Sequence, residues 1–259
     1  MTQQSPVIHG PVAIKNVAAF MVMTRRLLDR ASHLPGLAVC HAPSGYGKTW
    51  ASVFTQNKTQ AIRVEVGESW TKRFFLGAIL HEFGETFPKK SSIAELAERV
   101  INAMGENPNR PLIVDEADKL VDKGYIELVR EIQEASTAPV ILIGEEKLPQ
   151  KLLTVERVHN RVLDWMPAQP CDAEDTRVLA RALVPRITVK DDLIDAICAA
   201  SGGRARRIVV NLDQVREVAT NKGISTIDLK LFGGQRFHTG EPPQPRHVQM
   251  YAPKARAVA

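Results

Sequence analysis

The stretch "HAPSGYGKTW", residues 41–50, is the part of the sequence that decides the fold. It joins the apolar run LAVCHA (37–42) to TWASVFTQ (49–56), which continues as a helix. Gly45 and Gly47 permit backbone dihedrals that other residues rarely adopt. A strand, a glycine turn and a helix in this order can direct several N–H groups toward one point. The stretch predicts either a phosphate-binding loop or an ordinary glycine turn, and other segments must separate the two.

The stretch fits the phosphate-loop pattern G-x-x-x-x-G-K-[ST], except that Ala42 stands at the first glycine. In such a loop Lys48 bridges the β- and γ-phosphates of a nucleotide, and the Thr49 hydroxyl holds Mg²⁺. Backbone amides along the turn also contact phosphate oxygens. We therefore predict that the nucleotide is bound by Pro43, Ser44, Gly45, Tyr46, Gly47, Lys48, Thr49 and Trp50.

A pair of acids ends another apolar run, in LIVDEAD (112–118). A carboxylate at the end of a buried strand needs a cationic or hydrogen-bonding partner, and we predict that Mg²⁺ held by Asp115 and Thr49 is that partner. Glu116 is placed to orient and activate an attacking water. The plainer alternative is a strand end with two solvated acids. Together with the loop, the pair favours binding and hydrolysis of a nucleoside triphosphate, with Mg²⁺ as a cofactor.

Strands and helices alternate along the first two thirds of the chain. Helices are expected over 17–34, 70–84, 92–104 and 125–135, the third opened by a capping box at Ser92 and Glu95. This alternation predicts an α/β fold with a parallel five-stranded sheet covered on both faces. The expected strands are 37–42, 61–66, 110–118, 138–144 and 162–167.

The pattern changes after Pro167, and only helices are expected from Asp172 to about Leu231. We predict a lead-in segment (1–34), a nucleotide-binding domain (35–168), a small all-α lid (169–232) and a basic, flexible Pro/Gly-rich tail (233–259). The first 31 residues and the tail each carry a net charge of +3, whereas the whole chain carries +5. Basic ends suit an anionic partner such as nucleic acid, or are simply solvated.

Composition excludes several classes of protein. With 44% hydrophobic and 24% charged residues the chain is globular, and no uncharged apolar run is long enough to span a bilayer. The N-terminus lacks an export signal pattern, so we expect a cytoplasmic protein, bacterial or phage-encoded, with no membrane partner. Cys40, Cys171 and Cys198 are expected to be reduced core thiols, since they are odd in number and widely separated.

On these motifs the sequence resembles the AAA+ ATPases over residues 12–232. APSGYGKT resembles Walker A and LIVDEAD resembles Walker B. GGRARR (202–207) resembles the sensor-2 motif of the lid, and the resemblance implies that Arg206 approaches the γ-phosphate. It also implies an arginine finger in RVHNRVL (157–163), where Arg161 is preferred to Arg157. Each arginine taken alone could equally be a surface charge.

The sensor-1 position departs from the family, because Glu145 stands where Asn, Thr or Gln is usual. An ionised Glu cannot donate a hydrogen bond to phosphate, so slow turnover is expected even though Glu145 remains a candidate cofactor-binding residue. The spacing after this position is similar to that of the bacterial AAA_22 subgroup, which contains MuB, TnsC and ExeA.

Within that subgroup the closest resemblance is to the transposition ATPases of the MuB and TnsC type. It implies ATP-dependent, sequence-tolerant binding of double-stranded DNA, assembly of this chain into a filament or hexamer-like ring, and target capture for a partner transposase. Hydrolysis would be stimulated by assembly or DNA. The alternatives are a nucleotide-gated loader or regulator of a protein partner, of the helicase-loader or secretion type, and a signalling ATPase that does not cycle.

A DNA-contacting face is expected on the side of the core that lines the channel in AAA+ rings. Non-specific duplex binding depends on Lys and Arg contacts to phosphate, and neutral donors such as Thr71 or Ser91 can add to them. Ordinary solvated charges at helix ends are the alternative. The predicted DNA-binding residues are Thr71, Lys72, Arg73, Lys89 and Lys90, and Arg246, Lys254 and Arg256 of the tail are further candidates.

Overall fold

Five apolar runs form one parallel sheet in the computed structural model, which describes residues 12–241. Across the sheet the strands are ordered β2-β3-β4-β1-β5, and every neighbouring pair is parallel. The predicted five-stranded parallel core is therefore confirmed. In chain order the strands are β1 (Leu37–His41), β2 (Ile62–Glu65), β3 (Leu112–Asp115), β4 (Val140–Gly144) and β5 (Val162–Pro167).

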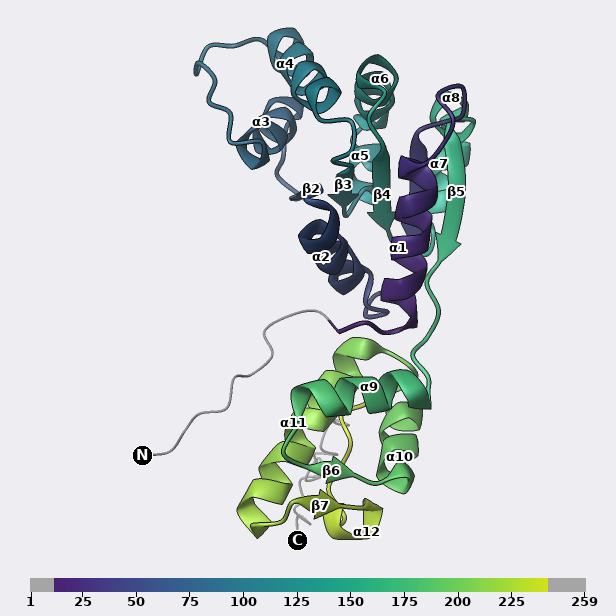
Figure 1. Cartoon of the computed structure of the whole chain (residues 1–259), viewed down its shortest axis with the longest axis vertical. Helices are drawn as coiled ribbons and strands as arrows, with labels where there is room; N and C mark the ends of the chain where they lie inside the picture. The colour runs from purple at the N-terminus through teal and green to yellow at the C-terminus, as the bar shows by residue number, and fades with distance from the viewer. Residues whose placement is uncertain (1–11, 242–259) are drawn as a thin grey trace, which may run out of the picture.

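Two helical layers cover the sheet, because side chains of the buried strands alternate between its faces (Figure 1). Ala38 and Cys40 of β1 belong to the apolar cluster of α1 and α2, whereas Leu37 and Val39 belong to that of α3, α4 and α6. The short helices α5, α7 and α8 were not expected. The helices of the core are α1 (Lys15–Leu28), α2 (Lys48–Thr59), α3 (Lys72–Glu82), α4 (Ile93–Glu106), α5 (Asp118–Asp122), α6 (Ile126–Ser136), α7 (Leu148–Leu153) and α8 (Glu156–His159).

The first helix is shorter than the predicted range 17–34, because it ends at Leu28. Pro35 disfavours a helical conformation at Leu34. Gly36 then passes so close to Gln133 that a Cβ atom at residue 36 would lie 2.2 Å from its side-chain nitrogen. These two constraints explain why the chain is irregular before it enters β1.

The lid lies beyond the carboxyl ends of the strands (Figure 1). Its helices are α9 (Ala173–Leu183), α10 (Asp191–Ser201), α11 (Ala205–Lys222) and α12 (Leu229–Phe232). The lid is helical as predicted, but it also contains a parallel pair of two-residue strands, β6 (Thr188–Val189) and β7 (Thr226–Ile227). Two-residue strands are too short to produce an alternating hydrophobic pattern, so the sequence did not predict them.

The start of the predicted tail is packed on the lid. Phe237 stacks on Phe232 with ring centroids 5.1 Å apart. The Asn211 side chain exchanges hydrogen bonds with the backbone of His238, at 3.2 and 2.7 Å. Residues 233–241 are thus held by α11 and α12, whereas the tail candidates Arg246, Lys254 and Arg256 lie outside the described residues.

All three cysteines are unpaired, as predicted. Burial raises the pKa of the Cys40 and Cys171 thiols to about 12 in each case, which makes both unreactive near neutral pH. Among the helices of residues 12–241, none combines the length and the apolar character needed to cross a membrane.

Candidate active site

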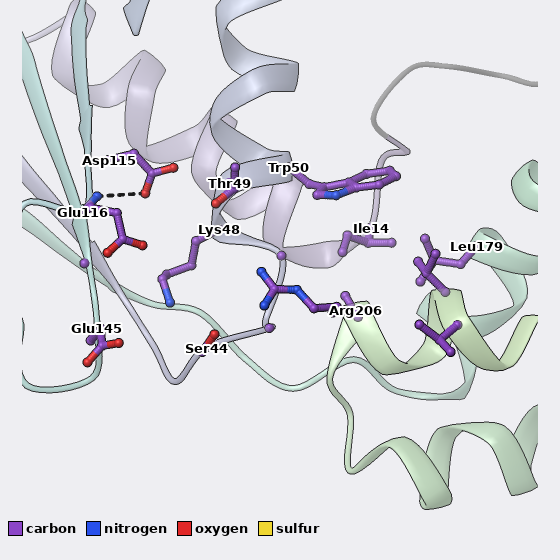
Figure 2. A pocket seen from close by; sticks show the side chains of 16 residues that line it. Ile14, Ser44, Lys48, Thr49, Trp50, Asp115, Glu116, Glu145, Leu179 and Arg206 are labelled. Carbon is purple, nitrogen blue, oxygen red and sulfur yellow. Dashed lines mark hydrogen bonds between the residues drawn. The ribbon is translucent and has the colours of Figure 1, made fainter. Parts of the chain in front are cut away.

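A cavity of about 250 Å³ lies between the carboxyl edge of the sheet and the lid. Of the residues predicted to bind nucleotide, Pro43 and Tyr46 do not line it. Figure 2 shows the polar side chains of Lys48, Glu116 and Glu145 facing one common space. The fold brings together ten of the predicted residues around this cavity: Ser44, Gly45, Gly47, Lys48, Thr49, Trp50, Asp115, Glu116, Glu145 and Arg206.

The glycine turn has the conformation that a phosphate cradle needs. Gly45 and Gly47 have φ of +90° and +83°, in the region that favours glycine. The Lys48 ammonium donates to the carbonyls of Ala42 and Pro43, at 2.6 and 3.1 Å, and so lies within the loop. Burial lowers the pKa of Lys48. The loop therefore combines two glycines at positive φ with a partly buried cation.

Asp115 is buried at the end of β3, but its cationic partner is a residue that we did not predict. Its Oδ2 lies 2.8 Å from Nη2 of Arg63, and its Oδ1 accepts a hydrogen bond of 3.0 Å from the Glu116 N–H. Arg63 on the neighbouring strand β2 neutralises this carboxylate, and Mg²⁺ held by Asp115 and Thr49 stays a prediction. The sequence shows an arginine in AIRVEV, but it does not show which strand lies beside β2.

Glu116 occupies a strained position. Its φ of +60° lies in the left-handed region, which costs on the order of 1 kcal/mol or more for a non-glycine residue. Its side chain is 44% exposed and its carboxylate lies 3.4 Å from the Lys119 ammonium. Figure 2 shows this carboxylate directed into the cavity beside Asp115. The backbone thus holds an acid at the open space where a phosphate would lie.

Glu145 follows β4 and lines the cavity opposite the loop. Its N–H donates to Oδ2 of the buried Asp118 at 2.7 Å. Asp118 also comes so close to Gly144 that a Cβ atom there would lie 2.2 Å from the same oxygen. Asp118, the last acid of LIVDEAD, therefore sets the position of Glu145, a function that sequence reasoning missed.

The lid closes the other side of the cavity with one cation and several apolar side chains. Figure 2 shows Arg206, from the first turn of α11, reaching toward the loop. Beside it, Arg204 donates to the Ser44 carbonyl at 2.6 Å. The apolar lining lies away from the acids and suits a nucleobase. Besides Trp50 it consists of residues that the sequence did not reveal, because only folding gathers them: Ile14, Leu179, Ala205, Val209 and Val210.

A buried amide ties the loop to both the first helix and the lid linker. Asn16 of α1 is 2% exposed. Its Nδ2 donates to the carbonyls of Tyr46 and Gln169, at 2.9 and 2.7 Å, and its Oδ1 accepts from the Gln169 N–H at 2.9 Å. Three segments distant in sequence are thus joined through one side chain.

The donors at the cavity fit Mg²⁺. Thr49 and Asp115 offer a hydroxyl and a carboxylate, the hard oxygen ligands that this ion uses together with phosphates and water. In the described part of the chain, no cluster of three or more His, Cys, Asp or Glu side chains could hold a metal by itself. A metal at this position would take its other ligands from water and phosphate.

The two arginine-finger candidates lie apart from this cavity. Arg161 is exposed and its Nε lies 2.5 Å from Glu134 Oε1. Arg157 is also exposed, and both border a shallow surface depression with Arg130 and Asn160. Neither arginine lines the cavity of its own chain.

The predicted DNA-contacting residues differ in how far their side chains are already hydrogen-bonded or buried. The Thr71 hydroxyl caps α3 by accepting from the Phe74 N–H at 3.2 Å. Arg73 donates to the carbonyls of Ser91 and Lys89. Ser91, a neutral candidate, is 7% exposed.

Two of the three lysines of this face are more open. Lys89 and Lys90 are exposed. The Lys72 ammonium lies 5.2 Å from the centre of the Tyr125 ring. Lys89 and Lys90 are therefore freer to contact a phosphate backbone than Arg73 and Ser91 are, whereas Lys72 is half-buried.

Comparison with known proteins agrees with this geometry. Residues 31–152, just under half of the chain, match the AAA_22 family, described as an AAA domain. The Aeropyrum pernix ORC2 protein, in ADPNP and ADP complexes, superposes with a TM-score of 0.70 at 13% identity, over 88% of this chain and 69% of that one. The chain has the AAA+ fold. A search of curated proteins found no match.

Two further solved structures are similar in fold. The Aeropyrum pernix ORC1 protein in complex with DNA gives a TM-score of 0.64 at 16% identity, covering 86% of this chain and 64% of that one. The Thermotoga maritima RuvB Holliday junction branch migration motor gives 0.59 at 17% identity, covering 85% and 67%. At such identities the likeness establishes the AAA+ architecture, and the function must be argued from the site.

Proposed function

We propose that this AAA+ chain is an ATPase that binds double-stranded DNA with little sequence preference and assembles on it. In this proposal it captures target DNA for a partner transposase and stimulates transposition. The observation that carries the ATPase part is the cavity in which a glycine loop, an acid pair and a lid arginine meet. The transposition part rests on the resemblance to the MuB and TnsC type.

Each side chain has a definite task in ATP hydrolysis. The loop amides and Lys48 bind the β- and γ-phosphates, and Arg206 adds charge from the lid. Mg²⁺ held by Thr49 and Asp115 would neutralise charge that develops on the phosphates. Glu116 accepts a proton from the attacking water. Glu145 carries no donor in its ionised form, so turnover should be slow.

Self-association would complete the site, because Arg161 is exposed and lies apart from the cavity of its own chain. In a filament or ring a neighbouring copy could place this guanidinium against the γ-phosphate, where such a contact accelerates hydrolysis by orders of magnitude. Nucleotide binding and assembly would then support each other.

The DNA contact is assigned first to Lys72, Lys89 and Lys90. These cations are not fixed by hydrogen bonds to the loop at 88–91, whereas Arg73 is. Binding through them should depend steeply on salt, since lysine–phosphate contacts release counterions. Arg73 stays a candidate, but its replacement would also disturb the loop that carries Lys89.

The deciding experiment is negative-stain imaging of the protein with duplex DNA, with and without a non-hydrolysable ATP analogue. We expect ordered assemblies on DNA only with the analogue. Lys48→Ala should abolish nucleotide binding and assembly, and Glu116→Gln should bind ATP, hydrolyse it poorly and leave stable assemblies.

Two other results would redirect the proposal. If Lys48→Ala binds ATP as well as the wild type, the loop assignment is wrong. If ATP binds but no assembly forms on DNA, a nucleotide-gated loader or regulator of a protein partner is the better description. Lys89→Ala and Lys90→Ala, each compared with Lys58→Ala on α2, test the DNA face, and equal DNA affinities would refute it.

A further inference from the structure

We infer that Arg63 is a built-in counter-charge for Asp115, and that it lets the cavity bind nucleotide without a metal ion. The inference rests on the proposed nucleotide site and concerns how that site works. Arg63 touches an acid at the reacting centre but not the cavity itself, so it is a positioning residue.

Arg63 is held in place by three partners. From β2 its Nη2 reaches Asp115 Oδ2 at 2.8 Å and Glu65 Oε2 at 3.1 Å, and its Nε donates to the Ser52 hydroxyl at 2.9 Å. The side chains of Arg63 and Asp115 are 15% and 4% exposed. A guanidinium fixed in this way loses little further freedom when it pairs with the carboxylate.

The contacts continue into the phosphate-binding helix. The Ser52 hydroxyl donates to the Thr49 carbonyl at 2.7 Å, and Asp115 in turn accepts from the Glu116 N–H. A chain of hydrogen bonds therefore runs from the first turn of α2, through Arg63, to both acids. Replacing Arg63 would break the link between the loop helix and the acid pair.

The charges around the cavity explain why this matters. Three acids line it, and Asp115 is the most buried of them. Within the described residues, Arg63 is the cation that lies within 4.0 Å of Asp115. An unpaired buried carboxylate is strongly unfavourable, and it would repel an incoming triphosphate in a region where screening is weak. In many nucleotide sites Mg²⁺ supplies positive charge beside the phosphates, whereas here Arg63 supplies it to Asp115 directly.

The test measures binding of a fluorescent ATP analogue, with an N-methylanthraniloyl label, in excess EDTA and in excess Mg²⁺. For the wild type, we expect the two Kd values to agree within about tenfold, which is about 1.4 kcal/mol. Arg63→Gln keeps hydrogen-bonding capacity and loses the charge. It should weaken binding in EDTA by ~30-fold or more, the typical penalty for leaving one member of a buried charge pair alone. Mg²⁺ should restore most of that loss by supplying the missing charge.

Two controls separate charge from structure. The Arg110 guanidinium bonds the Gln60 carbonyl, away from the acids. Arg110→Gln therefore removes a positive charge elsewhere, and it should leave the ratio of the Kd in EDTA to the Kd in Mg²⁺ unchanged. In the Asp115→Asn background, Arg63→Gln should change metal-free binding only a few-fold. This double variant contains no unpaired buried charge at the site, so it remains informative if Arg63→Gln alone does not fold.

The possible outcomes are distinct. The inference is overturned, while the ATPase proposal stands, if the wild type binds the analogue only with Mg²⁺. It is also overturned if Arg63→Gln leaves the ratio of the Kd in EDTA to the Kd in Mg²⁺ unchanged. If neither condition gives binding, or if Lys48→Ala binds normally, the nucleotide site itself is wrong.

Discussion

At the scale of single residues, the site depends on a few side chains whose surroundings alter their chemistry. Lys48 is partly buried among carbonyls, Glu116 is held at a positive φ, and Asp115 is neutralised by Arg63. Each arrangement constrains a side chain or the backbone, or places a charge in a buried position. Such local strain and buried charge concentrate at active sites.

As the pH rises, nucleotide affinity should begin to fall at a lower pH than it would if Lys48 had the usual pKa of a lysine. Burial lowers the pKa of Lys48, so the ammonium loses its proton below the usual value of 10.5 and the phosphates then lose their cation. Titrating the Kd for ATP from about pH 7.5 to about pH 10 measures this loss. Lys48→Arg, which does not titrate in that range, should bind more weakly but without the pH dependence. A wild-type Kd that is constant with pH would contradict the role of Lys48.

Gly144→Ala should destabilise the protein by about 1–3 kcal/mol, the usual range for overpacking a tight core site. The new methyl group would lie 2.2 Å from Asp118 Oδ2 and 2.6 Å from a Leu148 methyl carbon, so Asp118 must move. Urea denaturation measures the loss. Gly105→Ala is the matched control, because its methyl group would meet nothing closer than 3.8 Å. A Gly144→Ala variant as stable as Gly105→Ala would show that the contact relaxes freely.

At the scale of elements, some helices are specified by local sequence signals and others are held by long-range contacts. The capping box predicted at Ser92 and Glu95 is present at the start of α4, with both reciprocal hydrogen bonds. By contrast, α1 is held by contacts that its own sequence does not suggest. Lys15 pairs with Asp172 of the lid at 2.9 Å, and Asn16 bonds both the loop and the linker. The first helix thus joins the core to the lid.

Asn16→Ala should weaken nucleotide binding as well as stability. It removes hydrogen bonds to partly buried backbone groups of Tyr46 and Gln169, at about 0.5–1.5 kcal/mol for each bond, and it frees the loop to move. The measurements are the melting temperature and the ATP Kd well below it. Thr24→Val is the control on the same helix. Thr24 is fully buried, but its hydroxyl donates to the Phe20 carbonyl of the same helix, at 2.7 Å.

This control variant should lose stability without a change in nucleotide affinity. If Asn16→Ala also keeps the wild-type Kd, Asn16 only supports the fold and does not position the loop.

At the scale of the whole molecule, the proposed assembly would place the exposed arginines near β5 at a contact between copies. Arg161 and Arg157 lie on the surface, while the cavity opens between core and lid. Neither arginine lines the cavity of its own chain. In the proposal, assembly completes the site.

Arg161→Ala should leave ATP binding by the monomer intact and lower turnover at high protein concentration by ~10³-fold or more. The expected signature is loss of the concentration dependence of the specific ATPase activity, measured alongside binding. Arg157→Ala is the matched comparison from the same surface. If Arg157→Ala removes the dependence and Arg161→Ala does not, the finger is Arg157.

The sequence by itself determined the order of the elements and the residues of the loop. Apolar runs of strand length, glycines at the turn and acids after LIV are local features, and they predict the parallel core and the positions of Lys48, Asp115 and Glu116 correctly within it. Whether these residues bind ATP and metal stays a prediction. Local features suffice because strand pattern and turn chemistry act over a few residues.

Only the tertiary structure decided which residues meet. The partnership of Arg63 with Asp115 follows from β2 and β3 being neighbours in register, and the Asp118 contact follows from the close approach of α5 to β4. Asn16 reaches Tyr46 and Gln169 across 30 and 153 positions of the chain. Side-chain pairing of this kind depends on strand order and packing, for which a single sequence carries no periodic signal.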